Sequence, residues 1–165
     1  MARQALLDHV PIPVEQIHPI PGSQNPSEAA GCYETLLRGF FGGWPPRFDM
    51  VFLGLGENGH TASLFPGTPA LEERQRWVAE VDVAEQDVFR VTLTAPLLNQ
   101  AAVVVFLVTG AAKAAVLHEV LDGPHDPSRW PAQLIRPLDG ELRWLVDRTA
   151  ASLLVHETPE RTRVL

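Results

Sequence analysis

Residues 49–69, DMVFLGLGENGHTASLFPGTP, constrain the fold of this chain more than any other stretch. An almost continuous apolar run over residues 48–55 is typical of a parallel-sheet strand that is covered on both faces. The strand then breaks into a turn with three glycines, and a single histidine, His60, follows the turn. The stretch therefore predicts a buried strand whose end presents one titratable side chain on a glycine-rich loop, with few charges around it.

Strand and helix patterns alternate along the rest of the chain. Strands are predicted at residues 16–20, 77–83, 88–94, 101–108, 131–137 and 141–146, and helices at residues 3–9, 26–40, 95–100, 111–121 and 147–154. Asn25 as N-cap and Pro26 in the first turn mark the start of one helix. This alternation predicts an α/β fold with a mostly parallel sheet. The 165 residues are expected to form a single domain, with residues 156–165 as a frayed tail.

The composition excludes several classes of function. A formal charge of -7 argues against nucleic acid or a membrane as a partner, because both favour a basic face. A small anionic substrate stays compatible with this charge. Cys32 is the only cysteine, and neither a signal peptide nor an apolar run long enough to span a bilayer is present. A reducing, cytoplasmic setting is therefore expected.

Ligands of parallel sheets lie beyond the carboxyl ends of the strands, and two segments follow buried strands in this way. The first, residues 54–60, matches the pattern G-x-G-x-x-G of dinucleotide-binding loops. That fingerprint needs a full helix behind it, whereas Pro66, Gly67 and Pro69 leave room for a turn or two. The glycines more simply let the backbone approach a ligand. His60 is either a general base or a hydrogen-bonded histidine that closes the turn.

The second segment, residues 109–113, joins a valine-rich strand to a helix. A helix N-terminus after a parallel strand favours anions, and Lys113 in the first turn adds a cation to it. A site for phosphate or carboxylate and an ordinary surface lysine are equally compatible with this pattern. The spacing of the remaining histidines predicts no metal site.

Residues 48–67, FDMVFLGLGENGHTASLFPG, closely resemble the signature of the 6-phosphogluconolactonases, which share a superfamily with the glucosamine-6-phosphate isomerases. Later segments agree with that family: Val91 to Thr94 with Leu98 and Asn99, Thr109 and Gly110 with Lys113, Pro131 with Ala132, and Trp144 with Asp147, Ala150 and Ala151. The resemblance extends to about residue 154. It implies a Rossmann-like, mostly parallel sheet flanked by helices.

The resemblance also implies a reaction, the hydrolysis of 6-phospho-D-glucono-1,5-lactone to 6-phosphogluconate in the pentose phosphate pathway. His60 is then the general base that activates water. Lys113 binds the 6-phosphate, and Gly56, Asn58 and Gly59 complete the substrate site, with loop N–H groups available to the developing oxyanion. No metal or organic cofactor is implied, and the expected partner is a small sugar-phosphate lactone. The oligomeric state stays open, a monomer included.

The chain departs from the family pattern at two points. Many relatives carry aspartate where this chain has Asn58. The family's N-terminal strands, with a Ser-Gly-Gly-Ser-Thr phosphate loop and an Asp-Glu-Arg segment, have no counterpart here, so an N-terminally truncated domain with impaired activity is expected. Two alternatives remain: a non-catalytic remnant that binds a sugar phosphate or a partner chain, and a glucosamine-6-phosphate deaminase. The continuation over residues 61–66 favours the lactonases over the deaminases.

Overall fold

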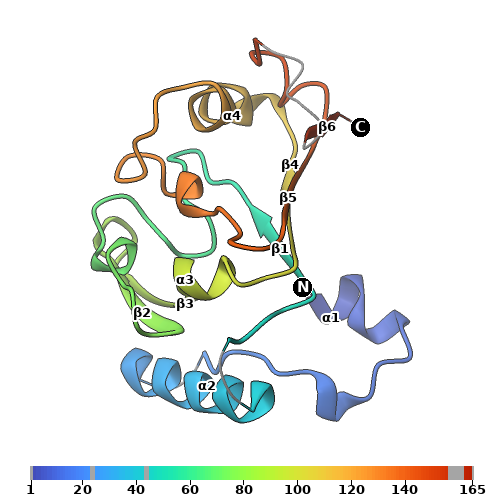
Figure 1. Cartoon of the computed structure of the whole chain (residues 1–165), viewed down its shortest axis with the longest axis vertical. Coiled ribbons are helices and arrows are strands. Elements are labelled where there is room, and N and C mark those ends of the chain that lie inside the picture. Colours follow the sequence, from blue (N-terminus) through green and yellow to red (C-terminus); the bar gives the residue numbers. More distant parts are fainter. Residues whose placement is uncertain (1, 23–24, 43–44, 156–161, 165) are drawn as a thin grey trace.

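The computed structural model describes residues 2–22, 25–42, 45–155 and 162–164, and Figure 1 shows their arrangement. In chain order, the helices and strands are α1 (Ala2–Ala5), α2 (Pro26–Phe41), β1 (Met50–Gly54), β2 (Val78–Val83), β3 (Val88–Leu93), α3 (Ala95–Leu98), β4 (Val103–Val108), α4 (Ala114–Leu121), β5 (Glu141–Val146) and β6 (Thr162–Val164). Short 3-10 turns lie at Leu7–His9, Val14–Gln16, Pro69–Leu71, Ala84–Gln86, Ala111–Lys113 and Pro131–Leu134.

The central sheet is parallel throughout, with the strand order β1-β4-β5-β6. Its register places Phe52 beside Val105 and Phe106 beside Trp144. The strands β2 and β3 form a separate antiparallel pair. The predicted α/β fold with a mostly parallel sheet is therefore confirmed, and all carboxyl ends of its strands point to the same edge.

One face of the sheet carries the main core. Leu53, Phe106 and Trp144 lie in a row across β1, β4 and β5 and are 8%, 0% and 4% exposed. The rings of Phe106 and Trp144 stack with centroids 3.9 Å apart and an interplanar angle of 7°. Buried residues of α4, including Leu117, belong to the same cluster. In Figure 1, α3, α4 and the β2–β3 pair all lie on this side of the sheet.

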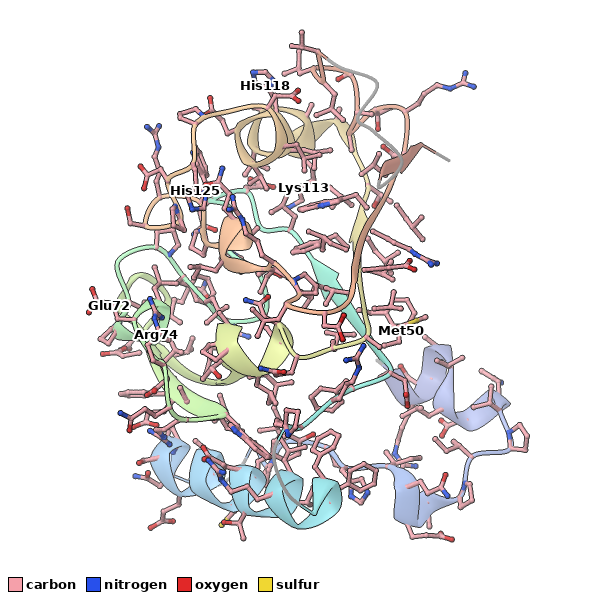
Figure 2. The ribbon with its side chains drawn as sticks, in the orientation of Figure 1. Met50, Glu72, Arg74, Lys113, His118 and His125 are labelled. Carbon is pink, nitrogen blue, oxygen red and sulfur yellow. The ribbon has the colours of Figure 1, made fainter. Side chains whose placement is uncertain are left out.

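The opposite face of the sheet is largely bare within the described part of the chain. Met50, Phe52 and Leu107 lie on it and are 48%, 63% and 48% exposed, and Figure 2 shows Met50 pointing away from the packed layers. The prediction that residues 48–55 are covered on both faces is therefore wrong. The apolar pattern of a two-sided strand is present, but the packing elements lie on one side only. Apolar surface of this kind favours association.

The helix α2 forms as its sequence predicts and covers the β2–β3 pair. The Asn25 side chain accepts hydrogen bonds from the N–H groups of the first turn, and Gly42 ends the helix in the left-handed conformation at φ 65°. Leu37 and Trp77 are buried in the cluster between α2 and the strand pair. The Arg38 guanidinium lies 4.2 Å above the centre of the Trp77 ring.

Several predicted elements differ from the structure. Residues 3–9 divide into α1 and a 3-10 turn, and no strand forms at residues 16–20. Residues 131–137, predicted as a strand, begin with the 3-10 turn Pro131–Leu134, and Pro131 lies in its first position, where the missing N–H group costs no hydrogen bond. Residues 147–154 form turns in place of a helix. In the tail predicted as frayed, residues 156–161 and 165 lie outside the described residues, and Thr162–Val164 pairs with β5.

Two phenylalanines on neighbouring strands provide a test of the one-sided core. Phe106→Ala removes a fully buried ring and is expected to lower the free energy of unfolding by about 3–5 kcal/mol. Phe52→Ala removes a ring that is 63% exposed, and the expected loss is below about 1 kcal/mol. Urea denaturation measures both, with Phe52→Ala as the matched control. Equal losses would show that the second face is packed in solution.

Candidate functional site

The two segments that the sequence selects meet at the carboxyl edge of the sheet. The loop after β1 carries His60, and the turn after β4 carries Lys113. Both side chains line one cavity of about 520 Å³, together with Phe52, Gly56 and Ala62. In Figure 2, Lys113 lies between α4 and the end of β1. Parallel pairing of β1 with β4 brings these two residues together, although 53 positions (113 − 60) separate them in the sequence.

The ring of His60 is held on three sides. Its Nδ1 lies 2.6 Å from Asn58 Oδ1, and its face stacks on Phe65 with ring centroids 4.2 Å apart. A Cβ atom at Gly56 would lie 2.0 Å from His60 Nδ1. Only glycine therefore leaves room for the imidazole at this place, which gives Gly56 a steric role in the site.

The hydrogen bonds of Asn58 define the tautomer of His60. Asn58 Oδ1 also accepts a hydrogen bond from the His60 backbone N–H at 3.3 Å, which orients the amide with its oxygen toward the histidine. A carbonyl oxygen only accepts, so Nδ1 of the neutral ring must be the donor. The lone pair of His60 is then on Nε2. The hydrogen-bond partner of His60 Nδ1 is thus a neutral amide.

The loop around His60 is closed by its own backbone. Gly56 N–H donates to the His60 carbonyl at 2.8 Å, and Gly59 N–H donates to the Gly56 carbonyl at 3.0 Å. These two N–H groups are thus occupied in this structure and are not free to bind an oxyanion. What Gly56 and Gly59 contribute here is close packing: a Cβ at Gly59, where φ is 76°, would lie 2.6 Å from the ring of Trp130.

A strained turn follows the histidine. Ala62 has a φ of 50°, a left-handed conformation that costs an L-residue about 1–2 kcal/mol. Its neighbours hold it: Thr61 Oγ1 donates to the Gly54 carbonyl at 2.9 Å, and Ser63 N–H donates to Thr92 Oγ1 at 3.1 Å. The second of these bonds ties the turn to β3. Residues 61–63 therefore join the sheet, the histidine loop and the β2–β3 pair.

The turn that carries Lys113 is held in place by Asp147, the residue that follows β5. Gly110 adopts a φ of 96°, and its N–H donates to Asp147 Oδ2 at 2.9 Å. Asp147 Oδ1 accepts from the Ala150 N–H at 2.7 Å, so this aspartate caps a turn and anchors the lysine segment together. These hydrogen bonds lower the pKa of Asp147, with the Ala150 N–H as the largest cause. Lys113 is also the only lysine of the chain.

The pKa of His60 is lowered from its ordinary value. Partial burial of the ring is the largest cause, and the positive charges of Lys113 and Arg90 add to it. All three causes disfavour the imidazolium. The surroundings of the ring therefore favour the neutral imidazole over the imidazolium.

Two other ligand classes receive no support from the described geometry. The structure continues from His60 into turns and the 3-10 turn Pro69–Leu71, so the helix that a dinucleotide fingerprint needs does not follow. Within the described residues, no cluster of histidine, cysteine or carboxylate side chains has the arrangement of a metal site. No helix among those residues has the length and apolarity needed to cross a membrane.

The fold and this site define an α/β protein with a small-molecule cavity at the carboxyl edge of its parallel sheet. A family model described as glucosamine-6-phosphate isomerases/6-phosphogluconolactonase matches residues 1–144. The chain belongs to this family.

Named relatives agree with this assignment. The 6-phosphogluconolactonase of Synechocystis sp. is 46% identical over 158 residues, which cover 93% of this chain and 65% of the relative. The human 6-phosphogluconolactonase is 44% identical over 154 residues, covering 92% and 59%. The solved 6-phosphogluconolactonase from Trypanosoma cruzi gives a TM-score of 0.79 at 29% identity, covering 94% and 65%. The chain thus spans no more than 65% of the length of these relatives.

Several residues of the site carry no signal in the sequence pattern. Phe65 and Trp130 resemble ordinary core residues, yet Phe65 supports the histidine ring and Trp130 covers Gly59. Asp147 is recognisable only as a cap. Arg90, on β3, acts on His60 through space. These contacts join segments that are distant along the chain, so local spacing does not reveal them.

The hydrogen-bond partner of His60, the neutral amide of Asn58, leads to a prediction about the pKa of His60. In Asn58→Asp, the introduced carboxylate stabilises the imidazolium, so the pKa of His60 is expected to rise. Proton NMR titration of the imidazole measures this pKa directly, and the acid limb of kcat/KM should move to higher pH in parallel. Asn99→Asp is the control, because Asn99 is bound to Leu134 and Arg136 outside the cavity. An unchanged or lowered His60 pKa in Asn58→Asp would contradict the assigned hydrogen bond.

Proposed function

We propose that the chain hydrolyses 6-phospho-D-glucono-1,5-lactone to 6-phosphogluconate, a step of the pentose phosphate pathway, with His60 as the general base. The observation that carries this proposal is the neutral, oriented imidazole beside Lys113 in one cavity. A volume of about 520 Å³ suits a small sugar phosphate. Relatives that are 44–46% identical bear the name of this activity.

The geometry supports a two-step hydrolysis. His60 Nε2 takes a proton from a water molecule while the water oxygen attacks the C1 carbonyl carbon of the lactone. The carbonyl oxygen becomes an oxyanion, and positive charge in the cavity stabilises it. The oxyanion then re-forms the carbonyl, the bond from C1 to the ring oxygen breaks, and the protonated imidazole returns its proton to that oxygen. The product is the open-chain acid, and His60 is neutral again.

Lys113 is proposed to hold the phosphate of the substrate. Its ammonium group acts as a point charge, so it attracts a phosphate without requiring one orientation. No carboxylate pairs with Lys113 among the side chains that the structure describes. An anionic ligand would therefore supply a charge that the described site lacks.

The cavity is open, and this limits the expected rate. Phe52, which is 63% exposed on the bare face of the sheet, forms part of its wall. Water then reaches the site from this side, which weakens the electrostatic effect of the cations on an oxyanion. We therefore propose a slow lactonase. The cytoplasmic location stays a prediction, and the oligomeric state stays open.

Removal of the base tests the mechanism. His60→Gln is expected to lower kcat by about 100- to 10,000-fold in an assay on freshly prepared lactone, after subtraction of spontaneous hydrolysis. His9→Gln, which changes an exposed histidine near the N-terminus, should retain the wild-type rate. A His60→Gln variant as active as the wild type would exclude the general-base role.

A wild-type protein without lactonase activity that binds 6-phosphogluconate would instead be a non-catalytic binding protein, and ammonia release from glucosamine 6-phosphate would indicate a deaminase.

Removal of the lysine separates phosphate binding from chemistry. Lys113→Gln is expected to raise KM for the phosphorylated lactone about tenfold, the loss of one charge-assisted contact. For glucono-1,5-lactone, which has no phosphate, kcat/KM should change little. The pKa of His60 should rise toward its ordinary value, because one of the charges that lowers it is gone. Equal losses on both lactones would assign Lys113 to the reacting centre instead of the phosphate.

A further inference from the structure

A second cavity, of about 650 Å³, lies apart from the cavity of His60. One of its walls consists of residues from the stretch 67–74, which leads from the histidine loop toward β2. The other wall consists of residues from the stretch 127–134, in the connection between α4 and β5. The two cavities share no lining residue. The second cavity is therefore a separate place at which a small molecule could bind.

Two side chains of opposite charge, Glu72 and Arg74, line the second cavity. Figure 2 shows both at the left edge of the molecule, away from Lys113. No ion pair within the described ranges includes either of them. Glu73, which lies between them in the sequence, instead accepts hydrogen bonds from the three N–H groups that follow it, at 2.7, 2.7 and 3.0 Å. One carboxylate thus stabilises the turn, and the neighbouring carboxylate and guanidinium are available to a ligand.

The guanidinium of Arg74 is oriented by the backbone of the same turn. Its Nη1 donates to the Leu71 carbonyl at 2.8 Å and to the Glu73 carbonyl at 2.9 Å, which uses both hydrogens of that nitrogen. Among the described residues, Nε and Nη2 have no acceptor. These two groups form an edge on which a guanidinium binds a carboxylate through two parallel hydrogen bonds. Arg74 therefore offers a carboxylate-binding edge that is already oriented, which lowers the entropy cost of binding.

The rest of the lining offers acceptors and apolar contacts. Ser128 Oγ donates to Asp126 Oδ1 at 2.5 Å, so the serine oxygen is left as an acceptor for a ligand. The Glu72 carboxylate is an acceptor as well, and an ammonium group with its three N–H donors complements both. Leu71, which is 8% exposed, and Leu134 add apolar surface. Together with the edge of the arginine, this lining suits a ligand that has a carboxylate, an ammonium group and an apolar part.

We propose that the second cavity binds an α-amino acid with an apolar side chain, whose carboxylate pairs with Arg74 and whose ammonium group lies between Glu72 and Ser128. A ligand with a carboxylate alone would place a like charge near Glu72, and an amine alone would leave the guanidinium without a partner. A zwitterion satisfies both groups. The inference goes beyond the proposed lactonase activity and does not depend on it, because no residue lines both cavities.

Three ligands test both charges on the wild-type chain, without any substitution. They are L-leucine, 4-methylpentanoate, which lacks the ammonium group, and 3-methylbutylamine, which lacks the carboxylate. NMR titration of the backbone amides measures each affinity and identifies the cavity that the ligand enters. L-Leucine is expected to shift the amides of Thr68, Glu72 and Ser128 with a dissociation constant of about 1 mM. Each analogue should bind about tenfold more weakly, because it loses one charge-assisted contact.

Two neutral variants assign each charge to one end of the ligand. Arg74→Gln is expected to weaken L-leucine binding about tenfold and to leave binding of 3-methylbutylamine unchanged, since the amine has no carboxylate for the guanidinium. Glu72→Gln should weaken L-leucine binding by a similar factor without weakening that of 4-methylpentanoate. Arg143→Gln is the control, because Arg143 is an arginine held by Glu141 on β5, outside the second cavity. It should bind all three ligands as the wild type does.

Several outcomes would overturn the inference. One is the absence of saturable shifts at about 20 mM L-leucine, and another is a set of shifts confined to residues around His60 and Lys113. Equal affinities of the wild type for the three ligands would show that the charges do not determine binding. Should Arg74→Gln fail to fold, this wild-type comparison decides alone. A wild type that binds L-leucine at the second cavity but does not hydrolyse the lactone would refute the proposed function and support this inference.

Discussion

Parallel pairing of β1 with β4 and of β4 with β5 is the constraint on which the site depends. It directs the loops that follow these strands to one edge of the sheet, where ligands of such sheets lie. The loop after β1 brings His60, the turn after β4 brings Lys113, and Asp147 after β5 anchors that turn through the Gly110 N–H. The site thus follows from strand direction, and each strand contributes one of its parts.

Within this frame, close packing gives the histidine its chemistry. Gly56 leaves the space that the ring fills, Phe65 supports its face, and Asn58 holds the proton on Nδ1. A neutral amide in this place orients the ring as a carboxylate would, but it does not stabilise the imidazolium. Burial and the nearby cations act in the same direction. The environment as a whole therefore favours the neutral form of the His60 ring, as the proposed role of a general base requires.

The sequence predicts most helices and strands of the packed part of the fold correctly. The α2 helix with its Asn25 cap, the strands β2 to β5 and the parallel sheet all follow from periodicity and end signals, because these are local properties. Residues 131–137 and 147–154 do not follow from such patterns: Pro131 begins a 3-10 turn, and Asp147 binds a distant N–H group in place of starting a helix. The exposure of the Phe52 side chain does not follow from the pattern either, because an apolar strand sequence does not specify which element packs on it.

For the candidate site, the residue types and their order along the chain predicted His60, Lys113 and the glycine loop, and His60, Lys113 and Gly56 line one cavity in the structure. A histidine and a lysine that each follow a buried strand must meet if the strands are parallel neighbours. Only the tertiary structure decided the rest. It joined the histidine loop to β3 through the hydrogen bond from the Ser63 N–H to Thr92 Oγ1, and it used the Gly56 and Gly59 N–H groups to close the loop. Such contacts depend on how packed layers are positioned, a property that local sequence does not encode.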